Sequence, residues 1–298
     1  MPANAVLQAG ECDAFIAVQD WWSVFGAVPA RVRLFWTGDA ADQYMNFGIG
    51  DKRVISRINA FIGVSDWHVN HMCEHSGFPR EKAFSIFNGV HLPWFEGSET
   101  RNKRRLIYTS TPYRGLDLVP QIYTKLRERF SDLELHVFAG LSVYDREKPF
   151  QGPEAQHFAR IRAVLEKLPG CTVHGNVLQS KLAREYMKSG IFFYPNTFYE
   201  MSCITALEAQ AAGCPIVTSA LGALPETVGD AGITIQGPPG TPDYTAAFAS
   251  ACEKILTDEN LWNQYSENGK RRVREKFTWE LAAGRLEKLL EKILPQKN

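Results

Sequence analysis

Apolar positions along the chain alternate between short continuous runs and stretches with helical spacing. The runs end in polar residues or glycine and predict buried strands, whereas the spaced stretches predict helices. One helix is expected over 64–78, with Ser65 as its N-cap and Gly77 as its end. This alternation is typical of a parallel sheet covered by helices. The strands expected in the first part of the chain are 13–19, 31–38, 60–65 and 83–90.

A second alternating series follows a segment without periodicity, 91–105, which holds proline, glycine and charges. We place an interdomain linker at 96–105. We therefore expect a shortened N-terminal domain at 1–95, a second domain at 106–275, and a final helix at 276–298 packing back toward the first domain. The strands expected in the second series are 105–110, 133–140, 171–177, 191–195, 215–219 and 232–236. The helices expected there are 115–130, 154–168, 180–190, 202–213, 243–257 and 259–293, the last with breaks.

The predicted fold class is α/β, with two Rossmann-like doubly wound domains of which the N-terminal one is incomplete. Ligands of such sheets bind outside the carboxyl ends of the strands. The segments that follow the strands should therefore carry the chemistry. These segments are 110–115, Gly140, 175–176 and 196–202.

Composition excludes several other classes of protein. Lys plus Arg and Asp plus Glu both number 33 in 298 residues, so no net charge points to nucleic acid or an anionic membrane as a partner. The six cysteines are scattered without a Cys-x-x-Cys pair, which favours a reducing, cytoplasmic location. No apolar run has the length of a membrane span, and the start of the chain lacks the pattern of a signal peptide.

Two glutamates, Glu200 and Glu208, flank the start of one predicted helix. Eight helical positions span about 12 Å, comparable to the distance from ribose to hexose in a nucleotide-sugar. Each carboxylate can accept hydrogen bonds from vicinal hydroxyls, and the helix N-terminus between them suits a diphosphate. Alternatively, Glu200 is a helix-dipole partner and Glu208 a surface residue. The neighbours of Glu208 are small or apolar, however, and a buried carboxylate is costly without a partner.

The region 199–232 resembles the E-x7-E region of retaining GT-B glycosyltransferases, specifically glycosyltransferase family 4. The segment 86–95 resembles the Asn-Gly-Val element of that family at its domain junction, and 105–140 resembles its first C-domain strand, phosphate loop and helix. The segment 173–196 is similar to the part that leads to the nucleotide site. The resemblance runs from about Asp13 to the C-terminus, and its motifs are specific in combination and order.

The resemblance implies a role for each matching residue. Glu200 would contact the donor sugar, Glu208 would bind the ribose hydroxyls, and Arg114 would stabilise the leaving diphosphate. The backbone of 201–204 would lie near the sugar and diphosphate, and 175–177 near the nucleobase. The donor-binding residues implied are Glu208, Met201, Ser202, Cys203, Ile204, Ser110, Thr109, Gly175, Asn176 and Val177.

The sequence departs from the family pattern at three places. Thr109 stands where the family usually has a second basic residue, so the diphosphate would have one charged partner fewer. The first half of the usual N-terminal domain is missing, so either the form is naturally short or a homo-oligomer or partner chain completes it. Where the family often has His before Asp, Gly38 takes the place of the His. Asp39 is then the polar candidate for a catalytic role, although a turn or helix cap is an equal interpretation.

The resulting hypothesis is a metal-independent, retaining hexosyltransferase without a cofactor, which moves a sugar from a nucleotide-diphosphate sugar to a carbohydrate or glycan acceptor. The sequence contains no Asp-x-Asp that would bridge a metal to the diphosphate. Two alternatives are an epimerase, and a non-catalytic subunit that binds a nucleotide-sugar or glycan. The spacing of His68, His71 and His75 could bind zinc, but a half-exposed helix face explains it better. The aromatic run 20–25 is either a sugar-stacking surface or a core seam.

Overall fold

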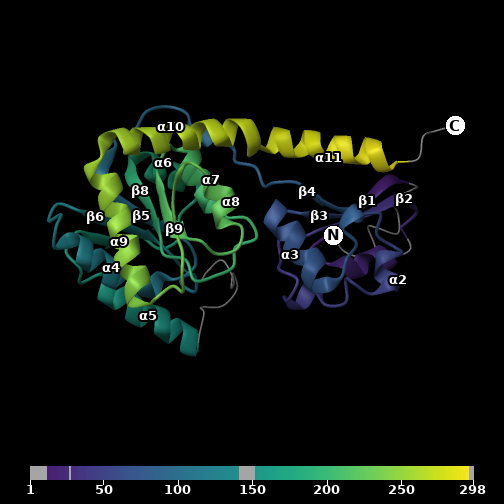
Figure 1. Cartoon of the computed structure of the whole chain (residues 1–298), viewed down its shortest axis with the longest axis horizontal. Helices are drawn as coiled ribbons and strands as arrows, with labels where there is room; N and C mark the ends of the chain where they lie inside the picture. The colour runs from purple at the N-terminus through teal and green to yellow at the C-terminus, as the bar shows by residue number, and fades with distance from the viewer. Residues whose placement is uncertain (1–11, 27, 141–151, 295–298) are drawn as a thin grey trace. The chain divides into compact units, whose positions relative to one another are not determined.

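The computed structural model describes residues 12–26, 28–140 and 152–294. These form two compact units, drawn in Figure 1. The first unit contains the chain up to Gly89 and again from Trp279 onward, and the second contains Val90–Thr278. The boundary between the two units therefore lies at Gly89–Val90, before the linker expected at 96–105. The last residues of that expected linker belong to strand β5, Asn102–Thr109.

The first unit is built on a sheet of four parallel strands in the order β1-β2-β3-β4. All four residues of β3 are buried, because one face of the sheet packs on a cluster around Phe35 and Phe61 and the other on a cluster around Leu34 and Ile62. The strands are β1 Cys12–Val18, β2 Ala30–Trp36, β3 Ala60–Gly63 and β4 Ala83–Ser85. The helical segments between them are η1 Trp21–Phe25, η2 Tyr44–Asn46, α2 Lys52–Ile55, α3 Asp66–Ser76 and η3 Arg80–Lys82.

Helix α3 confirms the helix predicted over 64–78. The Ser65 hydroxyl accepts a hydrogen bond from the His68 N–H at 2.9 Å, and Gly77 ends the helix with φ of 74°. The strand expected at 83–90 is wrong beyond Ser85. The reason lies at its far end, where the Val90 N–H donates to Phe277 O at 2.8 Å and so ties the chain to the second unit.

Helix α11, Trp279–Ile293, returns to the first unit and covers one face of its sheet. Ala282 and Leu289 are buried in the same cluster as Val32, Leu34 and Ile62. Leu286 and Leu290 pack against that cluster, so the apolar residues recur at helical spacing along one side of α11. The chain thus completes its first core with its last helix.

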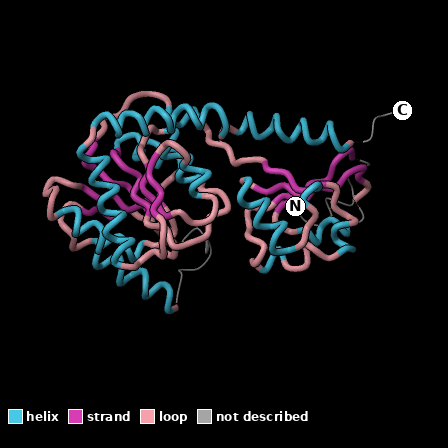
Figure 2. The backbone as a smooth tube through the Cα atoms, viewed as in Figure 1, coloured by secondary structure: helices cyan, strands magenta, loops and turns pink. Residues whose placement is uncertain are grey.

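The second unit holds six parallel strands in the order β10-β9-β8-β5-β6-β7. The strands appear in magenta, flanked by helices, in Figure 2. β8 lies in the middle of the sheet and all six of its residues are buried. The strands are β5 Asn102–Thr109, β6 Glu134–Phe138, β7 Cys171–Val173, β8 Ser189–Tyr194, β9 Ile216–Ser219 and β10 Gly232–Ile235.

The helices of the second unit enclose one large core that runs from Leu106 to Trp262 along the chain. The short helix α8 lies in a region for which the sequence predicted only a strand. The helical segments are η4 Leu92–Phe95, η5 Leu116–Leu118, α4 Val119–Arg127, α5 Pro153–Leu165, α6 Gln179–Lys188, α7 Ile204–Ala211, α8 Leu224–Val228, α9 Pro242–Thr257 and α10 Glu259–Lys276.

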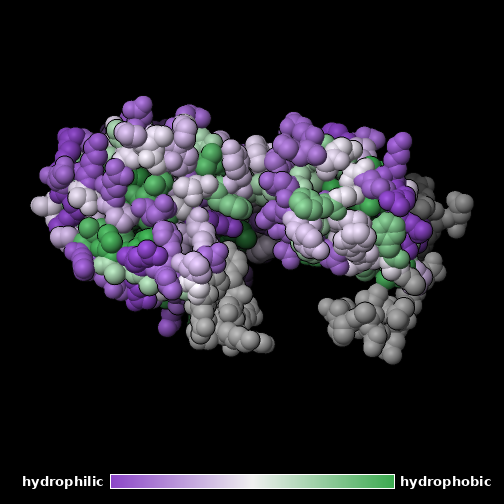
Figure 3. All heavy atoms as spheres, turned by 90° about the horizontal axis from the view of Figure 1, so that it is seen from below, coloured by the Kyte–Doolittle hydropathy of each residue, from purple (hydrophilic) through white to green (hydrophobic). Residues whose placement is uncertain are grey.

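On the face drawn in Figure 3, hydrophilic side chains surround smaller hydrophobic patches. On the first unit, Trp22, Phe25 and Phe47 are large hydrophobic side chains that remain exposed. Within the described ranges, no helix combines the length and the apolar character needed to cross a membrane.

The role of α11 predicts a stability effect. Leu289→Ala should lower the free energy of unfolding of the first unit by about 2–4 kcal/mol, because it leaves a cavity between α11 and the sheet. Urea denaturation followed by circular dichroism measures the change. Lys288→Ala removes the exposed neighbour on the same helix and should change it little. Equal effects of the two variants would contradict the packing role of Leu289.

Candidate functional site

The candidate site lies where the strand order of the second sheet reverses. β5 leads outward to β6 and β7, whereas its other neighbour, β8, leads outward to β9 and β10. Loops that leave two such strands diverge, which opens a crevice at their carboxyl ends. The loop after β5 contains Ser110 and Arg114, and the loop after β8 contains Asn196 and Glu200. The topology therefore brings together two of the segments that the sequence singled out.

Glu200 is buried and held from two sides. Its Oε1 accepts hydrogen bonds from Arg114 Nη1 and from the Tyr194 hydroxyl, each at 2.7 Å. The Arg114 guanidinium also lies over the Phe198 ring, 4.5 Å from its centroid. The Glu200 carbonyl accepts from the Ala223 N–H at 2.7 Å, which fixes the backbone. Glu200 and Arg114 are therefore a positioned ion pair in the crevice.

Buried tyrosines support the loop after β5. The Tyr108 hydroxyl donates to Thr111 O at 3.1 Å, and the Tyr194 hydroxyl lies 3.3 Å from Ser110 Oγ. The Thr109 hydroxyl shares a hydrogen bond with the Tyr186 hydroxyl. Thr109 stands where the family usually has a second cation. It is instead tied to a neutral hydroxyl.

Close approach of the two loops depends on Gly115. Its φ is 89°, and a Cβ built there would lie 2.0 Å from Pro195 O, which is backbone and cannot move aside easily. Any other residue at this position would push the loop after β5 away from the loop after β8. The glycine therefore sets the spacing between Arg114 and Glu200.

Helix α7 begins directly after the second loop. Its N-cap, Cys203, makes no side-chain hydrogen bond to the helix, so the first-turn N–H groups have no side-chain cap there. Met201 and Cys203 are buried, Ser202 is half-buried, and Ile204 is exposed. The start of α7 can accept an anionic group, since N–H groups and the helix dipole both favour negative charge there.

Glu208 lies inside α7 and is 4% exposed, so the interpretation of Glu208 as a surface residue is wrong. Its Oε1 accepts a hydrogen bond from the amide of Gln179, whereas its Oε2 has no hydrogen-bond partner within 12–26, 28–140 and 152–294. Burial raises the pKa of Glu208 to about 7, and the hydrogen bond from Gln179 opposes that rise. A buried carboxylate with one unsatisfied oxygen is a costly feature that a ligand hydroxyl would relieve.

A cavity of about 220 Å³ opens beside these residues. The predicted Thr109, Ser110, Gly175, Asn176 and Val177 all line it. Sequence reasoning missed other lining residues, although the position of Gln179 at the start of α6, close behind β7, is a signal that could have found it. Thr111 and Gly140, which also line the cavity, lie in the strand-end segments that the sequence singled out, whereas Phe138, Gln179, Leu182 and Thr205 were not predicted.

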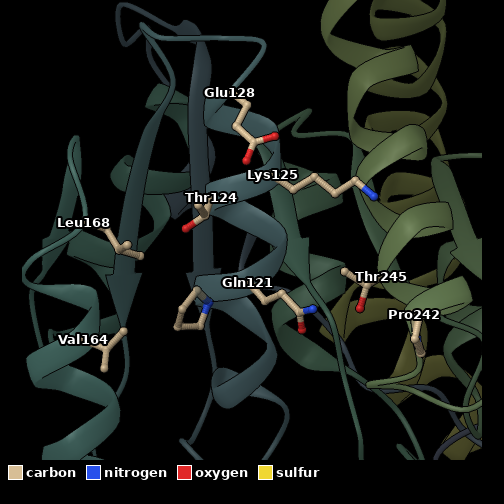
Figure 4. Close-up of a pocket in the computed structure, with 9 residues that line it drawn as sticks. Gln121, Thr124, Lys125, Glu128, Val164, Leu168, Pro242 and Thr245 are labelled. Carbon is tan, nitrogen blue, oxygen red and sulfur yellow. The ribbon is translucent and has the colours of Figure 1, made fainter.

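A larger cavity of about 630 Å³ lies elsewhere on the second unit, along α4 and beside α9 (Figure 4). Its walls come from side chains such as Gln121, Lys125 and Glu128 of α4 and Thr245 of α9. None of the predicted site residues lines it. We place the site at the smaller cavity, since that one lies at the strand ends and its wall residue Gln179 is hydrogen-bonded to the buried Glu208.

His68, the first histidine of α3, serves the fold. His68 is fully buried, its Nδ1 accepts from the Val64 N–H at 3.2 Å, and its Nε2 donates to Asp39 O at 2.9 Å. Burial lowers the pKa of His68 to about 4. With both ring nitrogens occupied, His68 is not available as a zinc ligand. Within the part of the chain that the structure describes, no group of three His, Cys, Asp or Glu residues is arranged to hold a metal ion.

Asp39 belongs to the first unit, whereas the other predicted site residues belong to the second. Its N–H donates to Thr37 Oγ1 at 3.0 Å, and its carbonyl holds His68. These contacts are those of a turn residue after β2. The catalytic role of Asp39 stays a prediction.

The model of the family described as "Glycosyl transferases group 1" matches residues 98–272, which is more than half of the chain. The chain is 25% identical to the MMP alpha-(1->4)-mannosyltransferase of Mycolicibacterium hassiacum, over 87% of this chain and 60% of that protein. It is 25% identical to a D-inositol 3-phosphate glycosyltransferase of Streptomyces bingchenggensis, over 79% of this chain and 53% of that protein. The chain thus spans little more than half the length of these curated relatives.

Solved structures share the fold. A glycosyltransferase from Rickettsia africae matches with a TM-score of 0.70 at 17% identity, over 90% of this chain and 72% of that one. The pneumococcal O-GlcNAc transferase GtfA, solved with UDP and GlcNAc, matches with a TM-score of 0.67 at 15% identity, over 90% of this chain and 53% of that one. Anabaena HepE, solved with UDP and glucose, matches with a TM-score of 0.68 at 12% identity, over 88% and 72%. These likenesses confirm the predicted α/β fold with two parallel sheets.

The burial of Glu208 predicts a stability that depends on pH. Because the pKa is raised from 4.5 to about 7 in the folded state, ionisation of Glu208 lowers stability as the pH rises through this window. Glu208→Gln removes this cost, so at pH 8 it should raise the free energy of unfolding by about 1–3 kcal/mol. At pH 5 the difference from the wild type should be small, since Glu208 is then largely protonated in the folded state.

Urea denaturation at both pH values measures this difference. Glu287→Gln, at an exposed position of α11, is the matched control and should show no such pH dependence. A gain for Glu208→Gln that is the same at both pH values would show that ionisation of Glu208 is not its cause.

Proposed function

Because the chain belongs to the glycosyl transferases group 1 family, we propose that it moves a sugar from a nucleotide-diphosphate sugar to a carbohydrate or glycan acceptor, with retention of configuration. The observation that carries the proposal is the pair of buried carboxylates, Glu200 and Glu208, at either side of the start of α7. Glu200 is paired with Arg114 at the switch point of the parallel sheet, and Glu208 is hydrogen-bonded to Gln179, which lines the 220 Å³ cavity.

The donor would lie along the carboxyl edge of the second sheet. The nucleobase would enter the cavity near Gly175–Val177, and the ribose hydroxyls would reach Glu208. The diphosphate would meet the start of α7 at 201–204, together with Ser110 and Arg114. The sugar would then contact Glu200, whose carboxylate can accept from sugar hydroxyls.

Catalysis in this proposal consists of stabilising the leaving group. When the bond between the sugar and the diphosphate breaks, negative charge develops on the diphosphate oxygen. Arg114 and the α7 N–H groups would stabilise that charge without moving far, since Glu200 and Phe198 already hold the guanidinium in place. The acceptor hydroxyl would attack the face that the diphosphate leaves and give its proton to the departing diphosphate oxygen, so that configuration is retained.

Thr109 distinguishes this site from the usual pattern of the family. Its hydroxyl is bound to the Tyr186 hydroxyl, so the end of β5 provides a neutral hydroxyl where a second cation is usual in the family. The proposal therefore assigns the diphosphate charge to Arg114, hydroxyls and backbone N–H groups alone.

The acceptor side is assigned more coarsely. The relatives named above are a mannosyltransferase and an inositol-phosphate glycosyltransferase, which supports a hydroxylated acceptor of the sugar or cyclitol class. Asp39 is the polar candidate on the first unit. UDP-sugars are the first donors to test, because two proteins of similar fold were solved with UDP.

A second candidate function is a non-catalytic subunit that binds a nucleotide-sugar or glycan. Two observations favour it. Thr109 replaces a basic residue, and Trp22, Phe25 and Phe47 form exposed hydrophobic surface on the first unit, of the kind that partner chains or further copies cover. Turnover by the isolated chain separates this candidate from the transferase, and an epimerase would convert a donor sugar without releasing the nucleotide.

A donor screen tests the proposal. The purified chain is mixed with UDP-, GDP-, ADP- and dTDP-sugars, and thermal shift and nucleotide release are followed. One donor should stabilise the wild type, and Glu208→Ala should weaken its binding at least about tenfold, as expected for the loss of a hydrogen bond to a charged group. The absence of a shift with every donor would overturn the assignment of Glu200 and Glu208. If a donor binds but its nucleotide is not released with any acceptor present, the non-catalytic candidate is favoured.

The role of Arg114 predicts a specific kinetic loss. Arg114→Ala should lower kcat about 100-fold or more while changing donor affinity much less, because its charge acts mainly when the diphosphate leaves. Single-turnover kinetics with the donor found in the screen measures the loss. Arg160→Ala, on the exposed side of α5, is the matched control and should leave kcat unchanged. A loss confined to KM would contradict leaving-group stabilisation.

A further inference from the structure

Gln179 is the first residue of α6 and lies at the edge of the 220 Å³ cavity. Its side chain is exposed, yet its amide nitrogen donates a hydrogen bond to Oε1 of the buried Glu208. A long polar side chain at an exposed position loses rotamer freedom when it is fixed in this way. The contact is therefore a specific link between the wall of the cavity and the carboxylate behind it.

The groups described below, which pack around α7, do not bond to the Glu208 carboxylate in place of Gln179. From α6, the Tyr186 hydroxyl is engaged by Thr109. From α10, Arg272 reaches Gln210 at 3.2 Å rather than Glu208, and Lys270 lies against Gly213 at the other end of α7. The neighbouring segments of α8 and β9, at 224–228 and 216–219, contribute Glu226, which accepts from Arg272 through its carbonyl, and no other charged side chain.

We propose that Gln179 is a positioning residue for donor recognition: its amide fixes Oε1 of Glu208, favours the carboxylate form, and leaves Oε2 for a ribose hydroxyl. This inference rests on the proposed function, which assigns the ribose to Glu208. Oε2 has no hydrogen-bond partner among the described residues, so it retains its full capacity to accept. A neutral amide suits the role, because it supports the anion without the strong pairing that a cation would bring.

The protonation of Glu208 gives this proposal a direct readout. Because burial raises its pKa to about 7, Glu208 changes protonation state near neutral pH, and a change in its hydrogen bonds changes the fraction in the carboxylate form. Loss of the amide donor raises the pKa of Glu208 further, and a cation in its place lowers it. If Gln179 had a purely structural role, neither substitution would move the pKa of Glu208.

The experiment follows the Glu208 carboxyl carbon by NMR in the full chain labelled with ¹³C-glutamate, across pH 5 to 9. The signal is assigned by its loss in Glu208→Gln. Gln179→Leu should move the titration midpoint up by about one pH unit, and Gln179→Arg should move it down. Ser180→Ala, the exposed neighbour on α6, should leave it unchanged. An unchanged midpoint in Gln179→Leu would overturn the proposal.

Binding of UDP and GDP as probes tests the part of the proposal that concerns donor recognition. In Gln179→Leu the affinity at pH 7 should fall about fivefold, the ratio of ionised fractions for a one-unit shift, and should recover toward the wild-type value at pH 9. Tighter binding at every pH would overturn the proposal, since the amide would then occupy the place of the ligand. Unchanged binding by Glu208→Gln would instead overturn the ribose assignment, and the NMR midpoint would still report separately on the Gln179 contact.

Discussion

The burial of two carboxylates at one edge of a parallel sheet is the constraint on which the site depends. Water stabilises an ionised carboxyl strongly, so a protein that buries one must replace that stabilisation with hydrogen bonds or an opposite charge. Glu200 has both, from Tyr194 and Arg114, and its backbone is tied to Ala223. Glu208 has a single amide donor, and its Oε2 has no partner among the described residues. The two residues therefore differ: Oε1 of Glu200 already accepts from two donors, one of them charged, whereas Glu208 accepts only from a neutral amide.

The sheet topology and a few backbone positions make this arrangement possible. The reversal of strand order between β5 and β8 separates two loops that would otherwise pack over one another. Gly115 then lets them approach to the distance at which Arg114 reaches Glu200, because a Cβ there would collide with Pro195 O. Gly222, with φ of 59°, allows a similarly close approach to the Glu200 backbone from the other side. The charges are thus positioned by backbone geometry as much as by their own contacts.

Much of this could be predicted from the sequence, because strand-ending runs and glycines are local signals. The α/β class, helix α3 with Ser65 and Gly77, and the importance of the segments after β5 and β8 all followed from such patterns. The partners could not be predicted, since Gln179, Tyr186 and Tyr194 lie far in sequence from the residues they hold or at ordinary core positions. The end of β4 at Ser85 was also missed, because the contact of Val90 with Phe277 that draws the chain away is long-range.

The contrast between the two glutamates also bears on how one site can both bind and react. A residue that must hold a ligand gains from an unsatisfied acceptor, because the ligand then supplies the missing hydrogen bond and binding is favoured. A residue beside the reacting bond gains from being fixed, since reorganisation during the reaction would add to the barrier. Glu208 lies inside α7 with one neutral donor, and Glu200 lies before α7, paired with Arg114. In the proposed function, binding falls to Glu208 and leaving-group stabilisation to the Arg114–Glu200 pair, so the two tasks rest on separate contacts.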